Sequence, residues 1–388
     1  MTETAPDIAG TLAELIRIPA PYPPGDTGAI CEAIAERLRG FGYTPEIVGP
    51  DATRRSVVAA IGSGKPEIVL NAHIDTITPG RAEDWSAEPY SGTVRDGRVW
   101  GLGAENCKGA AAVQMHVAEA IAARGGPKRG RVVFTFVGDE ESLDTGGTRF
   151  LRDQEMIAPD MLVLGGPTGC QLSCEERGVL WLEVACRGRS VHAGNPTIGD
   201  NAITRAARLI HRLETVLTPR LAERVSGPFR ATMSIGTIEG GHNLNAVPDH
   251  CVFGIDRRVL PPPAESVEAA TGEIRALLAE AGEPEGSWTL ERKIGTDGFR
   301  CPKDGPGITA HAEAIAAETG APAEFLISAG VSDGRHFSDL PIEIVAFGPG
   351  DGDRGHRPDE YVEIAQLERT WRIHLAALAR LTDGWKDA

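Results

Sequence analysis

Hydrophobic and polar residues in the first half of the chain follow helical and strand patterns in turn. Residues 27–41 and 110–123 carry apolar side chains at helical spacing, which predicts two helices. Short apolar stretches predict strands at 46–50, 56–62, 67–75 and 131–139. The last of these ends in acidic residues, and open α/β sheets collect their catalytic groups at such strand ends. The pattern therefore predicts an α/β sheet with a polar edge.

The pattern changes near residue 178, where strand character dominates. Strands are expected at 179–188, 231–240 and 250–259, with helices at about 199–216 and 264–282. Beyond residue 299 the α/β pattern returns, with a helix at 306–319, a strand at 343–347 and a terminal helix at about 364–382. We therefore predict a main α/β domain in two parts, 1–178 and 293–388, and a small α+β domain at 179–292.

Length and composition are typical of a soluble globular protein. A chain of 388 residues is too long for one compact core, which agrees with two domains. No stretch approaches the roughly 18 apolar residues of a membrane span. The N-terminus MTETAPDIAG lacks the basic region and apolar core of an export signal. We therefore expect a cytoplasmic protein.

The net charge limits the choice of binding partners, and the cysteine count indicates the state of the thiols. The net charge is −16 and no basic cluster is present, which argues against nucleic acid or an anionic membrane as a partner. Arginines are spread along the chain, so an anionic small substrate stays open. The seven cysteines are an odd number and scattered, so we expect reduced thiols rather than a disulfide framework.

Five short motifs carry the candidate chemistry. They are NAHIDT at 71–76, GLGAENCKG at 101–109, GDEES at 138–142, LGGPTG at 164–169 and GHRPDEY at 355–361. In the first motif, His73 and Asp75 are two residues apart at a strand end, so Asp75 can orient the imidazole of a metal ligand. In GDEES, the paired carboxylates of Glu140 and Glu141 follow an apolar strand. One of them can act as a general base while the other binds a metal.

In this order the five motifs resemble the dinuclear-zinc deacylase and exopeptidase family of acetylornithine deacetylase, succinyl-diaminopimelate desuccinylase, aminoacylase and carboxypeptidase G. The resemblance runs from His73 to Tyr361, and residues 347–362 are most similar to the acetylornithine deacetylase subgroup. It implies a mixed-sheet, zinc-exopeptidase-like α/β catalytic domain that is interrupted by a small ferredoxin-like α+β domain. In the family that domain usually forms the dimer contact, so a homodimer is expected.

The resemblance also implies roles for single residues. His73 takes the position of a ligand of the first metal, and Asp75 that of its orienting partner. Glu140 takes the position of the general base on the metal-bound water. Glu141 and His356 take the positions of ligands of the second metal.

Two positions depart from the family pattern. Where the family has an aspartate that bridges both zinc ions, this chain has Asn106, and a neutral amide is a poor zinc ligand. Where the family has a metal-binding glutamate, this chain has Gly166. Glu105 is adjacent to Asn106 but is expected to point elsewhere. We therefore expect at most one ion, zinc, cobalt or manganese, or none, with Asn106 as a weak ligand at best.

A thiolate would be another way to replace a lost ligand. Cys107 and Cys170 lie near the two changed positions in the sequence, and nothing but this proximity supports such a role.

The groups that handle substrate in the family are retained. His192, in SVHAGNPTIGDNAI, matches a histidine that reaches the neighbouring subunit's active site and stabilises the oxyanion. Asn245 and Arg258 match substrate-binding positions, and the arginine grips the substrate carboxylate as a bidentate donor. Ser332 and Arg335, in SAGVSDGRHF, match a further substrate segment.

Three functions follow from these observations. The first is an amidohydrolase of an N-acylated amino acid or small peptide that uses Glu140 as base and one metal at most. The second is a metal-independent enzyme that catalyses acyl transfer, cyclisation or another non-hydrolytic step, because positioning alone can offset much of a barrier. The third is a non-catalytic protein that binds an amino acid.

Overall fold

The fold is that of a computed structural model, which describes residues 5–328 and 330–386. The described residues divide into two compact units. Unit 1 comprises those within Met1–Cys174, Cys301–Leu326 and Ser332–Ala388, and unit 2 comprises Glu175–Arg300 with those of Ile327–Val331. The second unit thus interrupts the first, as expected.

Unit 1 is built around a six-stranded mixed sheet in the order β18-β9-β4-β8-β3-β2. Its strands are β2 (Glu46–Val48), β3 (Ser56–Ser63), β4 (Glu67–His73), β8 (Gly130–Val137), β9 (Met161–Leu164) and β18 (Glu343–Ala346). The four strands β18, β9, β4 and β8 are parallel to one another, whereas β3 and β2 pair in antiparallel fashion. Every residue of β4 is buried, which is typical of a central strand with both faces covered.

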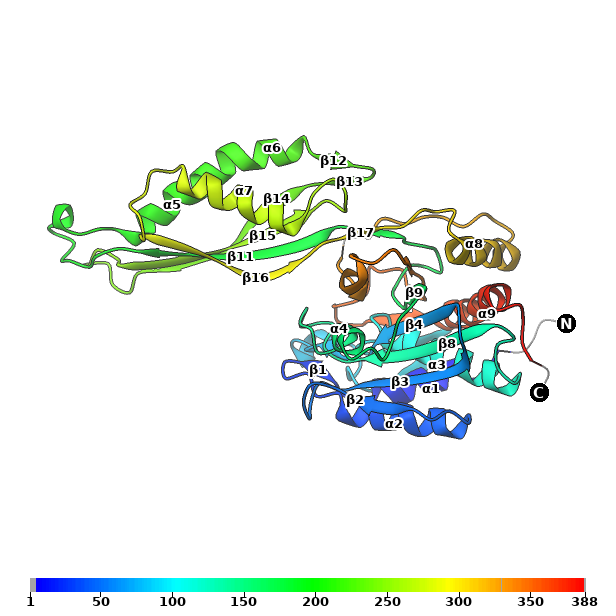
Figure 1. The fold of residues 1–388 in the computed structure, drawn as a ribbon. Helices are drawn as coiled ribbons and strands as arrows, with labels where there is room; N and C mark the ends of the chain where they lie inside the picture. Colours follow the sequence, from blue (N-terminus) through cyan, green and yellow to red (C-terminus); the bar gives the residue numbers. More distant parts are fainter. Residues whose placement is uncertain (1–4, 329, 387–388) are drawn as a thin grey trace. The chain divides into compact units, whose positions relative to one another are not determined.

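The helices of unit 1 are α1 (Ile8–Ile16), α2 (Gly28–Gly40), α3 (Lys108–Ala123), α4 (Thr148–Asp153), α8 (Pro306–Thr319) and α9 (Ile364–Leu381) (Figure 1). Helix α3 packs on β4 and β8, and α9 packs on α3 and α8. The smaller elements are β1 (Pro21–Tyr22) with β5 (Thr76–Ile77), the sheet of β6 (Thr93–Arg95), β7 (Arg98–Trp100) and β19 (Tyr361–Glu363), and two 3-10 turns, η1 (Ala82–Asp84) and η4 (Asp333–Phe337). The predicted helix at 306–319 is confirmed at its exact bounds, and α1 was not predicted.

Unit 2 is a four-stranded antiparallel sheet with its helices on one side (Figure 1). The sheet order is β14 (Thr232–Gly240), β15 (His250–Val259), β11 (Gly178–Arg187) and β16 (Trp288–Thr296). Against it pack α5 (Ala202–Arg212), which continues through a π-helical turn η3 (Leu213–Leu217) into α6 (Thr218–Ala222), and α7 (Val267–Ala279). A continuous apolar core lies between helices and sheet, so the expected small α+β domain is present.

The remaining elements of unit 2 are η2 (Pro196–Ile198) and two short antiparallel strand pairs. These pairs are β12 (Val225–Ser226) with β13 (Phe229–Arg230), and β10 (Glu175–Glu176) with β17 (Phe299–Arg300). The predicted boundaries at 178/179 and 292/293 therefore differ from the structure. Residues 288–296 form an edge strand of the sheet of unit 2, and the β10–β17 pair closes that unit beyond both boundaries.

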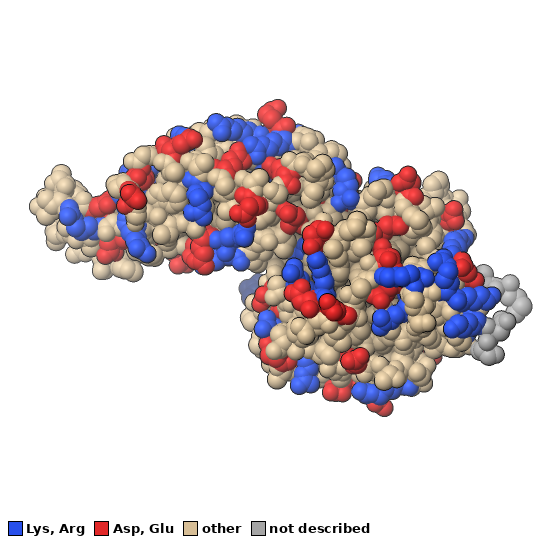
Figure 2. All heavy atoms as spheres, viewed as in Figure 1, with Lys and Arg blue, Asp and Glu red and all other residues tan. Residues whose placement is uncertain are grey.

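Three general features concern the surface charge, the helices and the cysteines. On the face shown in Figure 2, basic and acidic side chains are interspersed, and the described residues form no broad basic patch there. Among the described helices, none combines the length and the apolar character of a membrane span. All seven cysteines are buried.

Two buried carboxylates of unit 1 join loops that are distant in sequence. Glu105, 1% exposed, accepts backbone N–H bonds from Gly352 at 2.9 Å, Arg354 at 3.0 Å and Gly355. This carboxylate therefore points away from the metal-ligand positions, as predicted, and holds the loop that precedes His356.

Glu360, also 1% exposed, makes the converse set of contacts. It accepts N–H bonds from Gly103 at 3.0 Å, Glu105 at 2.8 Å and Asn106 at 3.0 Å. Burial raises the pKa of Glu360 to about 7, although these three N–H donors act against that rise. We call Glu105, Glu360 and their backbone donors the carboxylate clasp.

The clasp predicts the effect of an amide at Glu105. In Glu105→Gln one side-chain oxygen becomes an N–H donor that faces backbone donors, so at least one buried N–H loses its acceptor. We expect a loss of about 1–3 kcal/mol in the free energy of unfolding, measured with urea. Glu32→Gln, at an exposed position on α2, is the matched control. Equal stability of the two variants would contradict the clasp.

A second prediction comes from His311 and His374, which are buried beside Phe347. Burial lowers the pKa of His311 to about 4, and burial and the neighbouring His311 lower that of His374 well below its usual value. Between pH 6.5 and 4 the unfolded chain therefore binds protons that the native protein excludes. Stability should fall with falling pH in this window, by about 1.4 kcal/mol per pH unit for each histidine.

The variant His374→Phe tests this contribution, because it keeps a ring of similar shape and removes the titration. The pH dependence of its unfolding free energy between pH 4.5 and 6.5 should be shallower by about one proton than that of the parent protein. His211→Phe, at an exposed position of α5, should leave the slope unchanged. An unchanged slope in His374→Phe would refute the assignment.

Candidate active site

The candidate active site lies at the carboxyl ends of parallel strands in unit 1. His73 ends β4, and Glu140 and Glu141 follow β8, the strand that pairs with β4. Gly166 follows β9, which pairs with β4 on its other side. Because the carboxyl ends of parallel strands meet at one edge of a sheet, motifs far apart in sequence are brought together. The predicted gathering of polar groups at strand ends is confirmed.

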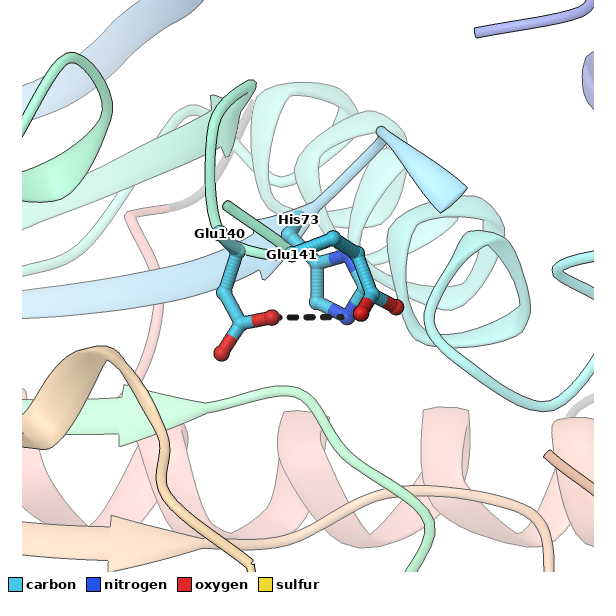
Figure 3. A group of neighbouring side chains, drawn as sticks. All are labelled: His73, Glu140 and Glu141. Carbon is cyan, nitrogen blue, oxygen red and sulfur yellow. Dashed lines mark ion pairs between the residues drawn. The ribbon is translucent and has the colours of Figure 1, made fainter. Parts of the chain in front are cut away.

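Three of the predicted residues form a tight cluster. Ligand atoms of His73, Glu140 and Glu141 all lie within 4.8 Å of one another. Figure 3 shows both carboxyl groups approaching the imidazole, with an ion pair of 4.0 Å between His73 Nε2 and Glu140 Oε2. Ligand atoms at this spacing could be brought together around a single metal ion.

Asp75 lies behind the imidazole of His73. His73 Nδ1 is 3.0 Å from the backbone oxygen of Asp75 and 3.5 Å from its carboxylate Oδ1. The other carboxylate oxygen accepts the backbone N–H of Glu141 at 3.0 Å. Burial lowers the pKa of His73, but Cys107, Asp75 and Glu140 together raise it well above its usual value. Asp75 thus contacts both the histidine and the segment with the paired glutamates.

Asn106 lies at the centre of the candidate ligands. Its Oδ1 is 3.3 Å from His73 Nε2, and its Nδ2 donates to Glu141 Oε1 at 3.1 Å. The same Nδ2 is 3.0 Å from His356 Nε2, which is in turn 2.9 Å from Glu141 Oε1. Glu141 raises the pKa of His356, whose backbone is in the left-handed conformation with φ 64°. The amide of Asn106 therefore lies between His73, Glu141 and His356, within hydrogen-bond distance of each.

Gly166 leaves open space on the other side of His73. A Cβ atom at this position would meet no atom within 4 Å. Cys107 Sγ donates to the Gly165 oxygen at 2.9 Å and influences His73, so this thiol lies on the same side. Cys170 Sγ instead contacts Thr370 on α9 at 3.4 Å, away from the cluster.

Glu140 is the strongest candidate for proton transfer. Burial raises its pKa to about 7, while His73 and Arg335 act in the opposite direction. Arg335 Nη1 is 3.4 Å from Glu140 Oε1. A carboxyl group with a pKa near neutrality can both accept and return a proton.

The expected substrate residues are divided between the units. In unit 1, Ser332 caps η4 by accepting the backbone N–H of Gly334 at 3.3 Å, and Arg335 lies within that turn. In unit 2, His192 and Asn245 are exposed and lie on segments joined by a backbone bridge.

Arg258, also in unit 2, is already engaged by a carboxylate. Its Nε and Nη2 donate to the two oxygens of Asp256 at 2.9 and 3.1 Å. Asp256 also accepts Trp181 Nε1 at 2.7 Å. A substrate carboxylate at Arg258 would therefore have to share the guanidinium with Asp256.

Sequence reasoning missed two features of the site. It assigned no role to Glu360, and it did not foresee that Arg335 faces Glu140. Both residues lie inside motifs that were singled out, but the sequence does not show which way a side chain points. A buried carboxylate and backbone donors on a partner loop are visible only in three dimensions.

Comparisons with known proteins show the family of the chain. Residues 69–380 match the model of Peptidase family M20/M25/M40. The succinyl-diaminopimelate desuccinylase of Rhodospirillum centenum is 30% identical over 397 residues, with 97% of each chain covered.

Solved structures share the fold. An M20 family metallo-carboxypeptidase from Sulfolobus solfataricus superposes with a TM-score of 0.79 at 15% identity and covers 97% of this chain and 99% of its own. A dinuclear metal-binding M20 peptidase from Bacillus subtilis gives a TM-score of 0.68 at 19% identity, with 96% and 98% covered. The α/β fold implied by the motifs is thereby confirmed. The chain belongs to peptidase family M20/M25/M40 and is a hydrolase of amide bonds.

Proposed function

We propose that this protein hydrolyses the amide bond of an N-acylated amino acid or small peptide at a centre that holds one divalent ion instead of two. The observation that carries the proposal is the retained cluster of His73, Glu140 and Glu141 beside two positions that have lost their carboxylates. The name of the relative from Rhodospirillum centenum, a desuccinylase of an acylated amino acid, supports this substrate class.

The charge of the site supports one ion. Asn106 and Gly166 replace two carboxylates of the family pattern, which removes two negative charges. The two lost negative charges equal the charge of one divalent cation. A site with one ion here would therefore have the same net charge as the full family site with two ions. Two cations would repel each other without a carboxylate between them, and an amide does not supply that charge.

The donors present fit one ion and do not fit a pair. Glu141 with His73 or His356 would hold it, because these three side chains contact one another or Asn106 directly. A catalytic zinc usually has three protein ligands. When bound, such an ion polarises the scissile carbonyl and lowers the pKa of a water molecule.

The protein's own residues then move the protons. Glu140 takes the proton of the attacking water and passes it to the leaving amine, which its pKa of about 7 allows near neutral pH. The backbone oxygen of Asp75 holds the imidazole of His73 at Nδ1. His192 serves as oxyanion donor and Asn245 and Arg258 as substrate ligands, as the family resemblance implies, with Ser332 in the segment beside them. A cytoplasmic homodimer formed through unit 2 is part of this proposal.

One observation favours a second candidate. The amide of Asn106 hydrogen-bonds Glu141 and lies within hydrogen-bond distance of His73 and His356, and His356 in turn contacts Glu141. Such a network needs no ion, so a metal-independent acyl transfer or cyclisation is the alternative function. It would rely on positioning and on proton transfer by Glu140 and His192.

The paired glutamates provide the test of hydrolysis. Purified protein loaded with zinc should release free amino acid from a panel of N-acetyl and N-succinyl amino acids. Glu140→Gln should lower kcat by about 10²–10⁴-fold with unchanged zinc content, because it loses only the base. Glu141→Gln, the matched neighbour, should lose zinc as well as turnover. Full activity of Glu140→Gln would exclude it as the base.

Metal stoichiometry tests the number of ions. Elemental analysis should find about one zinc per chain in the parent protein after zinc is offered, because Glu141 with His73 or His356 forms one ion site and no carboxylate links it to a second. Asn106→Asp with Gly166→Glu restores both carboxylates, and Gly166 has room for the new side chain. We expect about two zinc ions in that variant. Asn106→Asp with Gly166→Gln is the control.

The outcomes separate the candidates. Two zinc ions in the parent protein would contradict the proposal. None, with activity retained, would favour the metal-independent alternative. No gain in the restored variant would mean that Asn106 and Gly166 do not occupy the ligand positions.

A further inference from the structure

The side chain of Arg335 is one of the most deeply buried cations of unit 1. It belongs to η4 and is 1% exposed. A buried guanidinium needs carboxylate partners, because its desolvation is otherwise uncompensated. Two carboxylates meet it: Nη1 lies 3.4 Å from Glu140 Oε1, and Nη2 lies 3.5 Å from Asp333 Oδ1.

A chain of hydrogen bonds holds the partner carboxylate of Arg335 from behind. Asp333, 4% exposed, accepts the hydroxyl of Thr148 at 2.7 Å on its second oxygen. Thr148 accepts the side-chain amide of Asn71 at 2.8 Å, and Asn71 also donates to Thr135 at 3.1 Å. The chain thus begins on the central strands β4 and β8. Its members are buried, so the position of Arg335 is set by the sheet.

The contact distinguishes the two oxygens of Glu140. Oε1 faces Arg335, and Oε2 faces His73 Nε2 at 4.0 Å. A partial rotation of the carboxylate would break the ion pair with Arg335, whereas a half turn only exchanges two equivalent oxygens. One oxygen, Oε2 in this structure, therefore remains directed at the cluster.

We propose that Arg335 is a positioning residue that binds Oε1 of Glu140 and so keeps Oε2 directed at the reacting centre. This role differs from that of a ligand for a substrate carboxylate, and it rests on the proposed function of Glu140. The competing role has a physical basis, because Nε and Nη2 of Arg335 have no hydrogen-bond partner among the described residues. The experiment must therefore separate the two roles.

The first test compares two substrates that differ only in the α-carboxylate, an N-acyl amino acid and its carboxamide. A positioning role predicts that Arg335→Lys lowers kcat at least tenfold for both substrates and leaves KM within twofold. The reason is that Lys keeps the positive charge but lacks the planar guanidinium with its several N–H donors. A substrate-binding role predicts a rise in KM for the carboxylate substrate alone, and this result would overturn the proposal. Arg149→Lys, an exposed pair with Asp153 on α4, is the control.

Asp333→Asn is the second variant in the same assay, since it removes the charge behind Arg335 without touching Glu140. Asp333→Asn should also lower kcat for both substrates, by a smaller factor than Arg335→Lys. Unchanged kcat in both variants would overturn the proposal.

The second test requires no turnover. Urea unfolding of Arg335→Met, Glu140→Gln and the double variant forms a cycle that measures the coupling of the two side chains. We expect the double variant to lose less stability than the sum of the single variants, because each single change leaves a buried partner without its counterpart. Additive losses would overturn the proposal, and Arg335→Lys replaces Arg335→Met if the latter does not fold.

This separation matters if no N-acyl amino acid is hydrolysed. In that case the proposed function fails, and the cycle alone decides whether Arg335 holds Glu140.

Discussion

The candidate site depends on the way in which unit 1 compensates buried carboxylates. Glu105 and Glu360 are both almost fully buried, and each accepts three backbone N–H groups from the other's loop region. A carboxylate in such a position has given up water and depends on these donors. The two loops carry Asn106 and His356, whose side chains meet at 3.0 Å. The contact between residues 250 positions apart is therefore fixed by backbone hydrogen bonds.

On the proposed function, this fixed frame keeps a base and has lost part of its metal-binding charge. Glu140, the proposed base, lies between His73 and Arg335, and burial raises its pKa to about 7. The proposal assigns the lost carboxylates to Asn106 and Gly166, which would affect how many cations the site holds and not how a proton moves. Proton transfer and metal binding would then be carried by different residues of one sheet edge.

Much of the fold could be predicted because its elements repeat simple periods. Helices α3 and α8 and the buried strand β4 stand out by apolar spacing alone. Strand β16 did not, because its residues are largely exposed on an edge of the sheet, and the domain boundary was placed too early as a result. The grouping of His73, Glu140 and Glu141 could be predicted from the motifs. The direction of Glu360 and of Arg335 could not, since it depends on donors and acceptors that only the folded chain supplies.

The amide of Asn106 has a consequence for the apo-protein. In a centre with a bridging carboxylate, loss of the metal leaves several anions facing one another, and mutual repulsion drives them apart. Here the corresponding group is uncharged and offers both a donor and an acceptor, which bind His73, Glu141 and His356. On the proposed function, these contacts would keep the side chains in place without an ion, so the folded state would not depend on metal supply. A one-ion centre of this kind would release its ion and bind another without local unfolding.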